Sequence, residues 1–156
     1  MKETSTLQLP DEQATEGIAW KFAKIMPVPM VIFLQGDLGS GKTTFVRGFL
    51  RGLGYEGVVK SPTFTLVEAY SFQDYSVYHF DLYRLVRPEE LELIGIRDYF
   101  NDHAIVLVEW PNQGSGFLGD ADIELSFTMI PIGRKLTMNF LTKQGIEFKK
   151  RMEKER

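Results

Sequence analysis

Residues 30–43 read Met30-Val31-Ile32-Phe33-Leu34-Gln35-Gly36-Asp37-Leu38-Gly39-Ser40-Gly41-Lys42-Thr43 and combine an apolar run with a glycine-rich turn. The continuous apolar run at 30–34 is typical of a strand that is buried on both faces of a parallel sheet. The eight residues from Gly36 fit the pattern G-x-x-x-x-G-K-[ST] at every fixed position. Apolar residues then recur on one helical face, at Phe45, Val46, Phe49, Leu50 and Leu53. Strand, glycine-rich loop and amphipathic helix in this order predict an α/β fold with a phosphate-binding loop.

The loop suits a nucleoside triphosphate. Its glycines allow backbone N–H groups to turn inward toward a phosphate, and the helix that begins near Lys42 points its N-terminus at the same anion. We expect Lys42 to reach the β- and γ-phosphates and the Thr43 hydroxyl to ligate Mg²⁺. The absence of an Asn-Lys-x-Asp base reader and of a D-x-x-G switch after the loop favours ATP over GTP. The candidate nucleotide-binding residues of the loop are Gly36, Asp37, Leu38, Gly39, Ser40, Gly41, Lys42, Thr43 and Thr44.

Two acids downstream are candidates for the same site. Glu109 ends the apolar run Ile105-Val106-Leu107-Val108, where a second acid that steadies Mg²⁺ is expected, directly or through water. The alternative is a solvated glutamate at a strand end. Asp81 stands in an aromatic-rich strand, where aspartate is depleted. It either caps the next turn or positions a water at the γ-phosphate. His79, two residues earlier, is interpreted as an ordinary strand residue rather than a catalyst.

Three hydroxyl residues, Ser61, Thr63 and Thr65, surround Pro62 between the loop and Asp81. They form either an ordinary loop leading into a strand or a switch that follows the γ-phosphate. The position between the phosphate loop and Asp81 favours the switch.

The rest of the chain predicts a three-layer α/β domain with a mixed parallel and antiparallel sheet. A helix begins at Asp11 as N-cap and ends before Pro27. The remaining expected elements are an antiparallel pair at 63–70 and 76–82, a helix opening at 88–90, a strand at 104–108 and a hairpin at 123–130 and 135–141. Residues 1–156 form a single domain in this interpretation, and the charge run of the C-terminal tail at about 143–156 is interpreted as a solvated helix end.

Composition limits the partners and the location. The net charge of −3 includes a basic tail, with six basic and three acidic residues at 143–156, so the body of the chain is more acidic than the total. Direct binding to nucleic acid is therefore not expected. Neither a signal-peptide core nor an apolar run of membrane-spanning length is present. A cytoplasmic protein without cysteine chemistry, outside any membrane, is expected.

Taken together, four blocks resemble the bacterial TsaE (YjeE) family over about residues 9–135. The blocks are Gly36-Asp37-Leu38-Gly39-Ser40-Gly41-Lys42-Thr43-Thr44, Ser61-Pro62-Thr63-Phe64-Thr65-Leu66-Val67-Glu68, Tyr78-His79-Phe80-Asp81-Leu82-Tyr83-Arg84 and Val108-Glu109-Trp110-Pro111. The resemblance implies a P-loop ATPase that serves the synthesis of threonylcarbamoyladenosine (t6A) in tRNA. Such a subunit docks on the TsaB–TsaD pair with ATP and Mg²⁺, hydrolyses ATP to reset the complex, and meets tRNA only through its partners.

The resemblance also implies roles for individual residues. Lys42, Asp81 and Glu109 would serve hydrolysis, and Thr43 with Glu109 would hold Mg²⁺. Asp11 and Arg134 fall where the family contacts the nucleotide, although Asp11 equally suits a helix cap and Arg134 a hairpin turn. Trp110 would pack beside the site or at the partner surface. No catalytic arginine is evident near the loop, which predicts slow turnover without partners.

Two other functions remain open from the residues alone. A small P-loop metabolite kinase would have the same loop, although no arginine-bearing lid segment is evident. An ATP-gated interaction module would bind the nucleotide without turnover.

The first prediction concerns the loop lysine. Lys42→Ala should abolish nucleotide binding or turnover, because it removes the charge that neutralises the β- and γ-phosphates. Calorimetric titration with ATP measures this, and wild-type affinity in the variant would contradict the assignment of the loop.

Overall fold

The apolar run at residues 30–34 forms the centre of the sheet. In the computed structural model, which describes residues 2–155, β2 (Met30–Gly36) pairs in parallel with β5 (Ala104–Glu109) on one side and with β6 (Ile123–Met129) on the other. All six residues of β5 are buried, as expected for a strand covered on both faces. Met1 and Arg156, the ends of the expected domain 1–156, lie outside the described residues.

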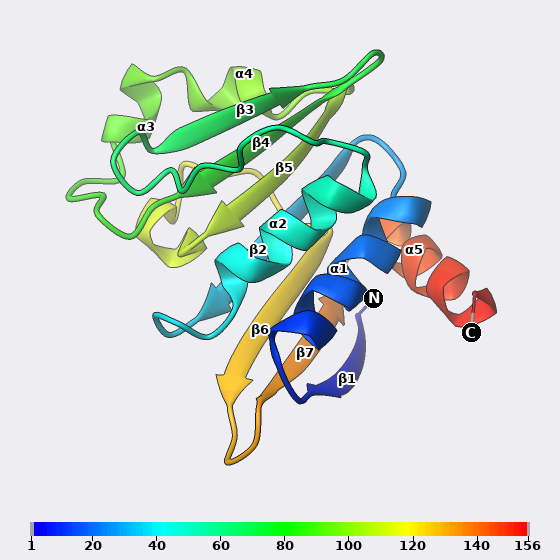
Figure 1. Cartoon of the computed structure of the whole chain (residues 1–156). Helices are drawn as coiled ribbons and strands as arrows, with labels where there is room; N and C mark the ends of the chain where they lie inside the picture. The colour runs from blue at the N-terminus through cyan, green and yellow to red at the C-terminus, as the bar shows by residue number, and fades with distance from the viewer. Residues whose placement is uncertain (1, 156) are drawn as a thin grey trace.

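Seven strands make one mixed sheet in the order β1-β7-β6-β2-β5-β4-β3 (Figure 1). β4 (Ser76–Asp81) pairs in parallel with β5, and β3 (Val67–Ser71) pairs antiparallel with β4. On the other side, β7 (Arg134–Phe140) pairs antiparallel with both β6 and β1 (Glu3–Leu9). The predicted mixed sheet is therefore confirmed, with its parallel strands in the middle.

Helices lie on both faces of the sheet. The long helices α1 (Glu12–Ile25), α2 (Lys42–Gly52) and α5 (Lys143–Lys154) share one buried apolar cluster with side chains of β2, β6 and β7. The short helices α3 (Glu90–Leu93), α4 (Ile96–Tyr99) and the 3₁₀ turn η1 (Pro111–Gly114) adjoin a second cluster. Along β5 the side chains alternate between the two clusters, which confirms the three-layer arrangement.

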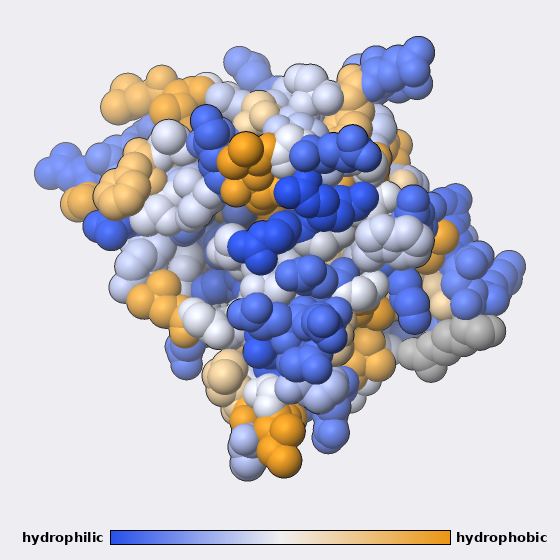
Figure 2. Space-filling model, viewed as in Figure 1, coloured by the Kyte–Doolittle hydropathy of each residue, from blue (hydrophilic) through white to orange (hydrophobic). Residues whose placement is uncertain are grey.

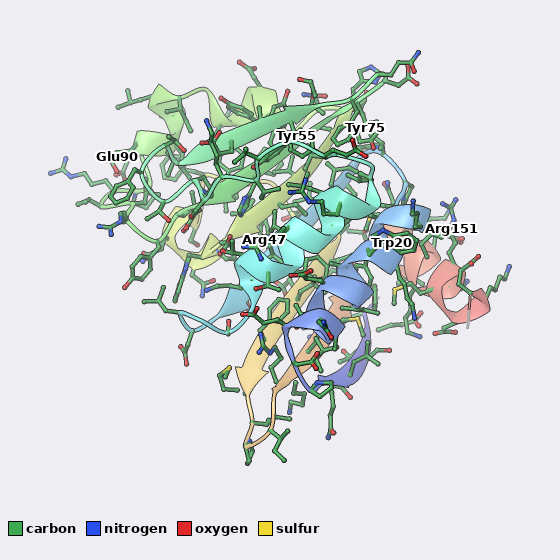
Figure 3. All side chains as sticks on the ribbon, in the orientation of Figure 1. Trp20, Arg47, Tyr55, Tyr75, Glu90 and Arg151 are labelled. Atoms are coloured by element: carbon green, nitrogen blue, oxygen red, sulfur yellow. The ribbon has the colours of Figure 1, made fainter. Side chains whose placement is uncertain are left out.

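Helices α1 and α2 pack closely because α2 carries glycine at the contact. A Cβ at Gly48 would lie 2.6 Å from the Glu16 carbonyl oxygen. On the outer side, Arg47 Nη1 lies 3.7 Å from Glu16 Oε1, and Figure 3 shows Arg47 pointing away from the core. Polar side chains cover this outer face (Figure 2). The N-cap prediction is confirmed, since Asp11 Oδ1 accepts a hydrogen bond of 2.8 Å from the Ala14 N–H.

Several expected boundaries are wrong. The segment 63–66 is a turn rather than the start of a strand, because the Leu66 N–H bonds to the Pro62 carbonyl and Leu66 has a φ of 73°. The helix opening at Pro88 is only four residues long and begins at Glu90. Arg134 is the first residue of β7 rather than part of the hairpin turn. Strand β1 was not expected at all.

The charged tail is a helix that contributes to the core. In α5, the Phe148 ring is fully buried and lies edge-on to Phe22 with 4.9 Å between centroids. Thr142 caps the helix by accepting from the Gly145 N–H, and Lys149 bonds to Glu3 at 3.1 Å. Within the described residues the charge run is a solvated helix end as expected, with Glu147 and Lys150 exposed, but the burial of Phe148 in the core was not predicted. None of the helices in the described part of the chain has the length and apolar content needed to cross a membrane.

The position of Phe148 gives a stability prediction. Phe148→Ala should lower the free energy of unfolding by about 3–5 kcal/mol, because it opens a cavity between α5, α1 and the sheet. The matched control is Phe64→Ala, at a ring that is 85% exposed, which should change stability by less than about 0.5 kcal/mol. Urea unfolding measures both, and equal effects would contradict the packing of α5.

Candidate nucleotide-binding site

The glycine-rich loop connects the end of β2 to the start of α2. Gly41 precedes the helix with a φ of 114°, a conformation that side chains with a Cβ rarely adopt. A Cβ at this position would also lie 2.8 Å from Arg134 Nη1. The loop closes on itself where the Ser40 N–H bonds to the Asp37 carbonyl at 3.1 Å. The sequence thus places glycine where the backbone turns into the helix and where Arg134 approaches it.

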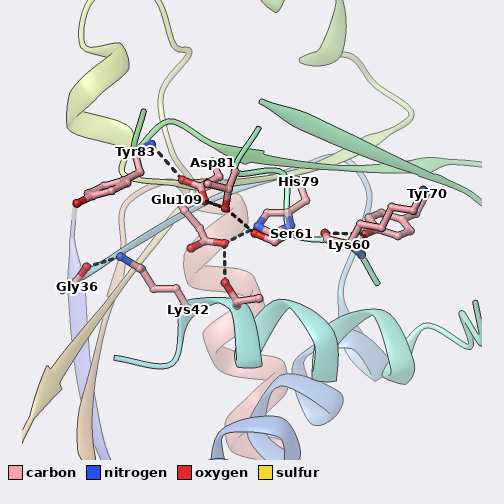
Figure 4. Close-up of polar contacts among 11 residues, drawn as sticks. Gly36, Lys42, Lys60, Ser61, Tyr70, His79, Asp81, Tyr83 and Glu109 are labelled. Carbon is pink, nitrogen blue, oxygen red and sulfur yellow. Dashed lines mark hydrogen bonds and ion pairs between the residues drawn. The ribbon is translucent and has the colours of Figure 1, made fainter. Parts of the chain in front are cut away.

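Lys42 extends from the first turn of α2 across the mouth of the loop. Its ammonium group donates to the Gly36 carbonyl (Figure 4). It also lies 3.6 Å from the centroid of the Trp110 ring. Burial lowers the pKa of Lys42 from its ordinary value, while the nearby carboxylates of Glu109, Asp81 and Asp37 act in the opposite direction. The cation is therefore desolvated before any ligand arrives, and the surrounding carboxylates favour its charged form.

A cavity of about 370 Å³ opens between the loop and the carboxyl ends of β4 and β5. This volume falls in the range of small-molecule sites. The lining residues are Glu12, Leu38, Gly39, Gly41, Lys42, Thr43, Thr44, Ser61, Thr63, Asp81, Tyr83, Arg84, Glu109, Trp110 and Arg134. Residues far apart in sequence thus meet around one space.

Glu109 ends β5 directly opposite Asp81, the last residue of β4. Its Oε2 atom accepts from the Thr43 hydroxyl at 3.4 Å and lies 2.6 Å from His79 Nε2. The carboxylate is nearly fully buried, so the interpretation of Glu109 as a solvated strand end is wrong. Hydroxyl and carboxylate oxygens are the ligand types that Mg²⁺ prefers, so Thr43 and Glu109 fit the ion that a triphosphate carries.

Asp81 connects the strand end to the hydroxyl-rich loop. Its Oδ1 accepts from the Tyr83 N–H at 3.0 Å, which is the turn cap considered from the sequence. Its Oδ2 accepts from the Thr63 hydroxyl at 3.4 Å, and Thr63 is 2.7 Å from the Ser61 hydroxyl. Thr65 instead bonds to Glu68 at 3.1 Å and does not line the cavity. Only two of the three switch candidates therefore face the site.

Of the remaining candidate residues, some reach the cavity and others do not. Arg134 reaches the loop from β7, with Nη1 3.5 Å from the Ser40 carbonyl oxygen. Asp11 does not line the cavity, because its carboxylate caps α1, and the neighbouring Glu12 lines it instead. Asp37 and Ser40 belong to the loop but lie outside the lining. Trp110 lies beside the site, with its ring 5.0 Å from that of Tyr83.

Sequence reasoning missed several residues of the site. Arg84, which had not been assigned to the site, lines the cavity, and its guanidinium lies 4.7 Å from the centroid of the Phe64 ring. With Arg134 it places two arginines beside the loop, although no catalytic arginine was evident from the sequence. His79 is a packed strand residue, as interpreted, but its buried contact with Glu109 was not predicted. The available signal was its spacing of two from Asp81, which places both side chains on the same face of β4.

A phosphate-binding loop between a central parallel strand and a helix, with a buried acid at the end of the neighbouring strand, defines a P-loop nucleotide-binding fold. Residues 9–136 match the family model described as "Threonylcarbamoyl adenosine biosynthesis protein TsaE". The chain belongs to the TsaE family.

Individual relatives agree with this assignment. The chain is 45% identical to "tRNA threonylcarbamoyladenosine biosynthesis protein TsaE" of Haemophilus influenzae, covering 92% of this chain and 94% of the relative. It is 43% identical to the protein of the same name from Bacillus subtilis, covering 76% of this chain and 81% of the relative. The crystal structure of Bacillus subtilis YdiB superposes with a TM-score of 0.84 at 25% identity, covering 99% and 97% of the two chains.

The geometry of Gly41 gives a prediction for the loop. Gly41→Ala should strain the backbone by about 1–3 kcal/mol, because a residue with a Cβ rarely adopts a φ of 114°. It should also weaken ATP binding, because the loop conformation is altered and the Arg134 guanidinium is displaced. Isothermal titration calorimetry measures the affinity.

The control for Gly41→Ala is Gly17→Ala, inside α1, where a Cβ meets nothing within 4 Å. That substitution should leave ATP affinity unchanged and stabilise the helix by up to about 1 kcal/mol. Unchanged affinity in Gly41→Ala would show that the loop does not bind the phosphates in the conformation described.

Proposed function

We propose that the protein binds ATP with Mg²⁺ in this cavity and hydrolyses ATP as the accessory subunit of t6A synthesis in tRNA. The proposal rests most directly on one juxtaposition: the Thr43 hydroxyl, the Glu109 carboxylate and the Lys42 ammonium converge on the space in front of the helix N-terminus. Membership of the TsaE family and the names of the relatives support the pathway.

The chain itself supplies the groups that a triphosphate needs. The loop N–H groups and the first turn of α2 would hold the β-phosphate, and Lys42 would exchange its contact with the Gly36 carbonyl for phosphate oxygens. Thr43 and Glu109 would hold Mg²⁺, which neutralises phosphate charge when bound. Arg134, next to Ser40 and Gly41, would add a second cation on the other side of the loop.

Asp81 is the best-placed group to orient the attacking water. It borders the same cavity as Lys42, and the Tyr83 N–H fixes one of its oxygens. The other oxygen accepts from Thr63, so movement of the hydroxyl-rich loop would change what Asp81 can bind. Ser61 and Thr63 would therefore change their contact with Asp81 when a γ-phosphate is bound, as the residues of a switch do.

Partner dependence has support in the surface around the cavity. Leu38 in the loop, Phe64 in the hydroxyl-rich loop and Val86 after β4 are 66%, 85% and 83% exposed. Of these, Leu38 lines the cavity and Phe64 contacts the cavity residue Arg84, and exposed apolar surface next to a site is where a protein partner could bind. We assign this surface to the TsaB–TsaD pair, with tRNA held by the partners because the body of this chain is acidic. A single domain over 1–156 and a cytoplasmic location remain predictions.

Phosphate release from ATP tests the proposal. The wild-type chain should release phosphate slowly alone and faster with the TsaB–TsaD pair. Glu109→Gln should lower the rate in the complex at least about tenfold, because the amide is a poorer partner for Mg²⁺. Glu124→Gln, on β6 outside the cavity, is the matched control and should keep the wild-type rate.

The same assay separates the alternatives. Transfer of labelled phosphate to a small acceptor would identify a metabolite kinase. ATP-dependent capture of the partner pair without phosphate release would identify a gated interaction module. Either result would overturn the ATPase proposal.

A further inference from the structure

His79 and Glu109 form a buried pair that the proposed roles of the site do not use. His79 Nε2 lies 2.6 Å from Glu109 Oε2, and the two side chains are 0% and 4% exposed. Both residues lie on the face of the sheet that carries α2, because His79 is two residues before Asp81 and Asp81 is opposite Glu109. The pair connects the interior of the sheet to the mouth of the cavity.

The direction of this hydrogen bond follows from the chemistry of the two groups. An ionised carboxylate only accepts, so the hydrogen is on Nε2 and His79 donates. Within residues 2–155, His79 Nδ1 is buried and has no hydrogen-bond partner. A ring nitrogen left unpartnered in the core carries a free-energy cost. Among the described residues, the one hydrogen bond of the His79 side chain is with Glu109.

The contact fixes one oxygen of Glu109. Both hydrogen bonds recorded for this carboxylate within residues 2–155, from His79 and from Thr43, end on Oε2. With Oε2 held by His79 from inside the sheet and by Thr43 from the first turn of α2, Oε1 is the oxygen available to the cavity. A side chain that binds a metal is oriented by its own hydrogen-bonding partners, which also tune its affinity for the metal. Loss of such a partner typically lowers the metal affinity about 10–100-fold.

We propose that His79 is a positioning residue that holds the Glu109 carboxylate in the orientation that binds Mg²⁺ with the nucleotide. His79 does not itself line the cavity and contacts the lining at Glu109, so it would act on the metal through Glu109. The proposal rests on the proposed function, in that it requires a Mg²⁺–nucleotide complex in the cavity.

The test is the ratio of ADP affinities with Mg²⁺ and with EDTA. His79→Leu removes the donor, and the ratio should fall about 10–100-fold while the affinity in EDTA stays within about threefold of wild type. His79→Gln places an amide N–H near the position of Nε2 and should restore most of the ratio. His103→Gln, at the other histidine of the chain, is the control and should match wild type.

Two results would overturn the proposal. One is an unchanged ratio in His79→Leu. The other is an equal fall of both affinities, which indicates a purely structural role. If the wild-type chain binds no ADP, or binds it without a Mg²⁺ effect, the proposed function fails instead, so the two failures are distinguishable.

If His79→Leu does not fold, a measurement on the wild-type chain tests the positioning role of His79 instead. Imidazole nitrogen NMR should show His79 with its hydrogen on Nε2, and its signals should shift when Mg²⁺ is added to the ADP complex. His103 serves as the internal reference. A hydrogen on Nδ1, or no response to Mg²⁺, would contradict the proposal.

Discussion

Strands β2, β5 and β4 run parallel, so their carboxyl ends meet at one edge of the sheet. This pairing brings the glycine-rich loop, Glu109 and Asp81 together, although they are separated by dozens of residues in the chain. The central strands β2, β5 and β4 are covered on both faces, which leaves little freedom for their register to slip. The geometry of the site therefore follows from the fixed register of the buried parallel strands. Ligands of open α/β sheets commonly bind at this edge for the same reason.

The second organising feature is the balance of charge around Lys42. Burial lowers the pKa of this lysine, and the carboxylates of Glu109, Asp81 and Asp37 oppose that effect. The same carboxylates would repel a triphosphate, so Mg²⁺ and the loop N–H groups are needed to make phosphate binding favourable. A charged ligand can thus bind to an acidic chain, because the local groups rather than the net charge of −3 meet the phosphates. His79 stabilises this arrangement from inside the sheet.

Sequence reasoning succeeded where the determinants are local. The glycine pattern, the apolar run at 30–34 and the acid after Val108 each lie in a few consecutive residues, and they predicted the loop, the central strand and the position of Glu109. It failed where long-range packing decides. β1 joins the sheet through backbone pairing with β7, so its polar side chains gave little signal. The charges of α5 concealed Phe148, which is buried by contact with Phe22. Arg134, which only the family resemblance pointed to, reaches the loop from the start of β7, where it pairs with Leu9 at the end of β1. The contact of His79 with Glu109 could be placed only once β4 and β5 were in register.

The central claim is that the loop, β4 and β5 form one Mg²⁺–ATP site. A crystal structure of the chain with Mg²⁺ and a non-hydrolysable ATP analogue tests it most directly. The account predicts the β-phosphate at the N-terminus of α2, the Lys42 ammonium on phosphate oxygens, and the metal ion beside the Thr43 hydroxyl with Glu109 bound directly or through water. A nucleotide bound elsewhere, or a metal ion remote from both Thr43 and Glu109, would contradict it.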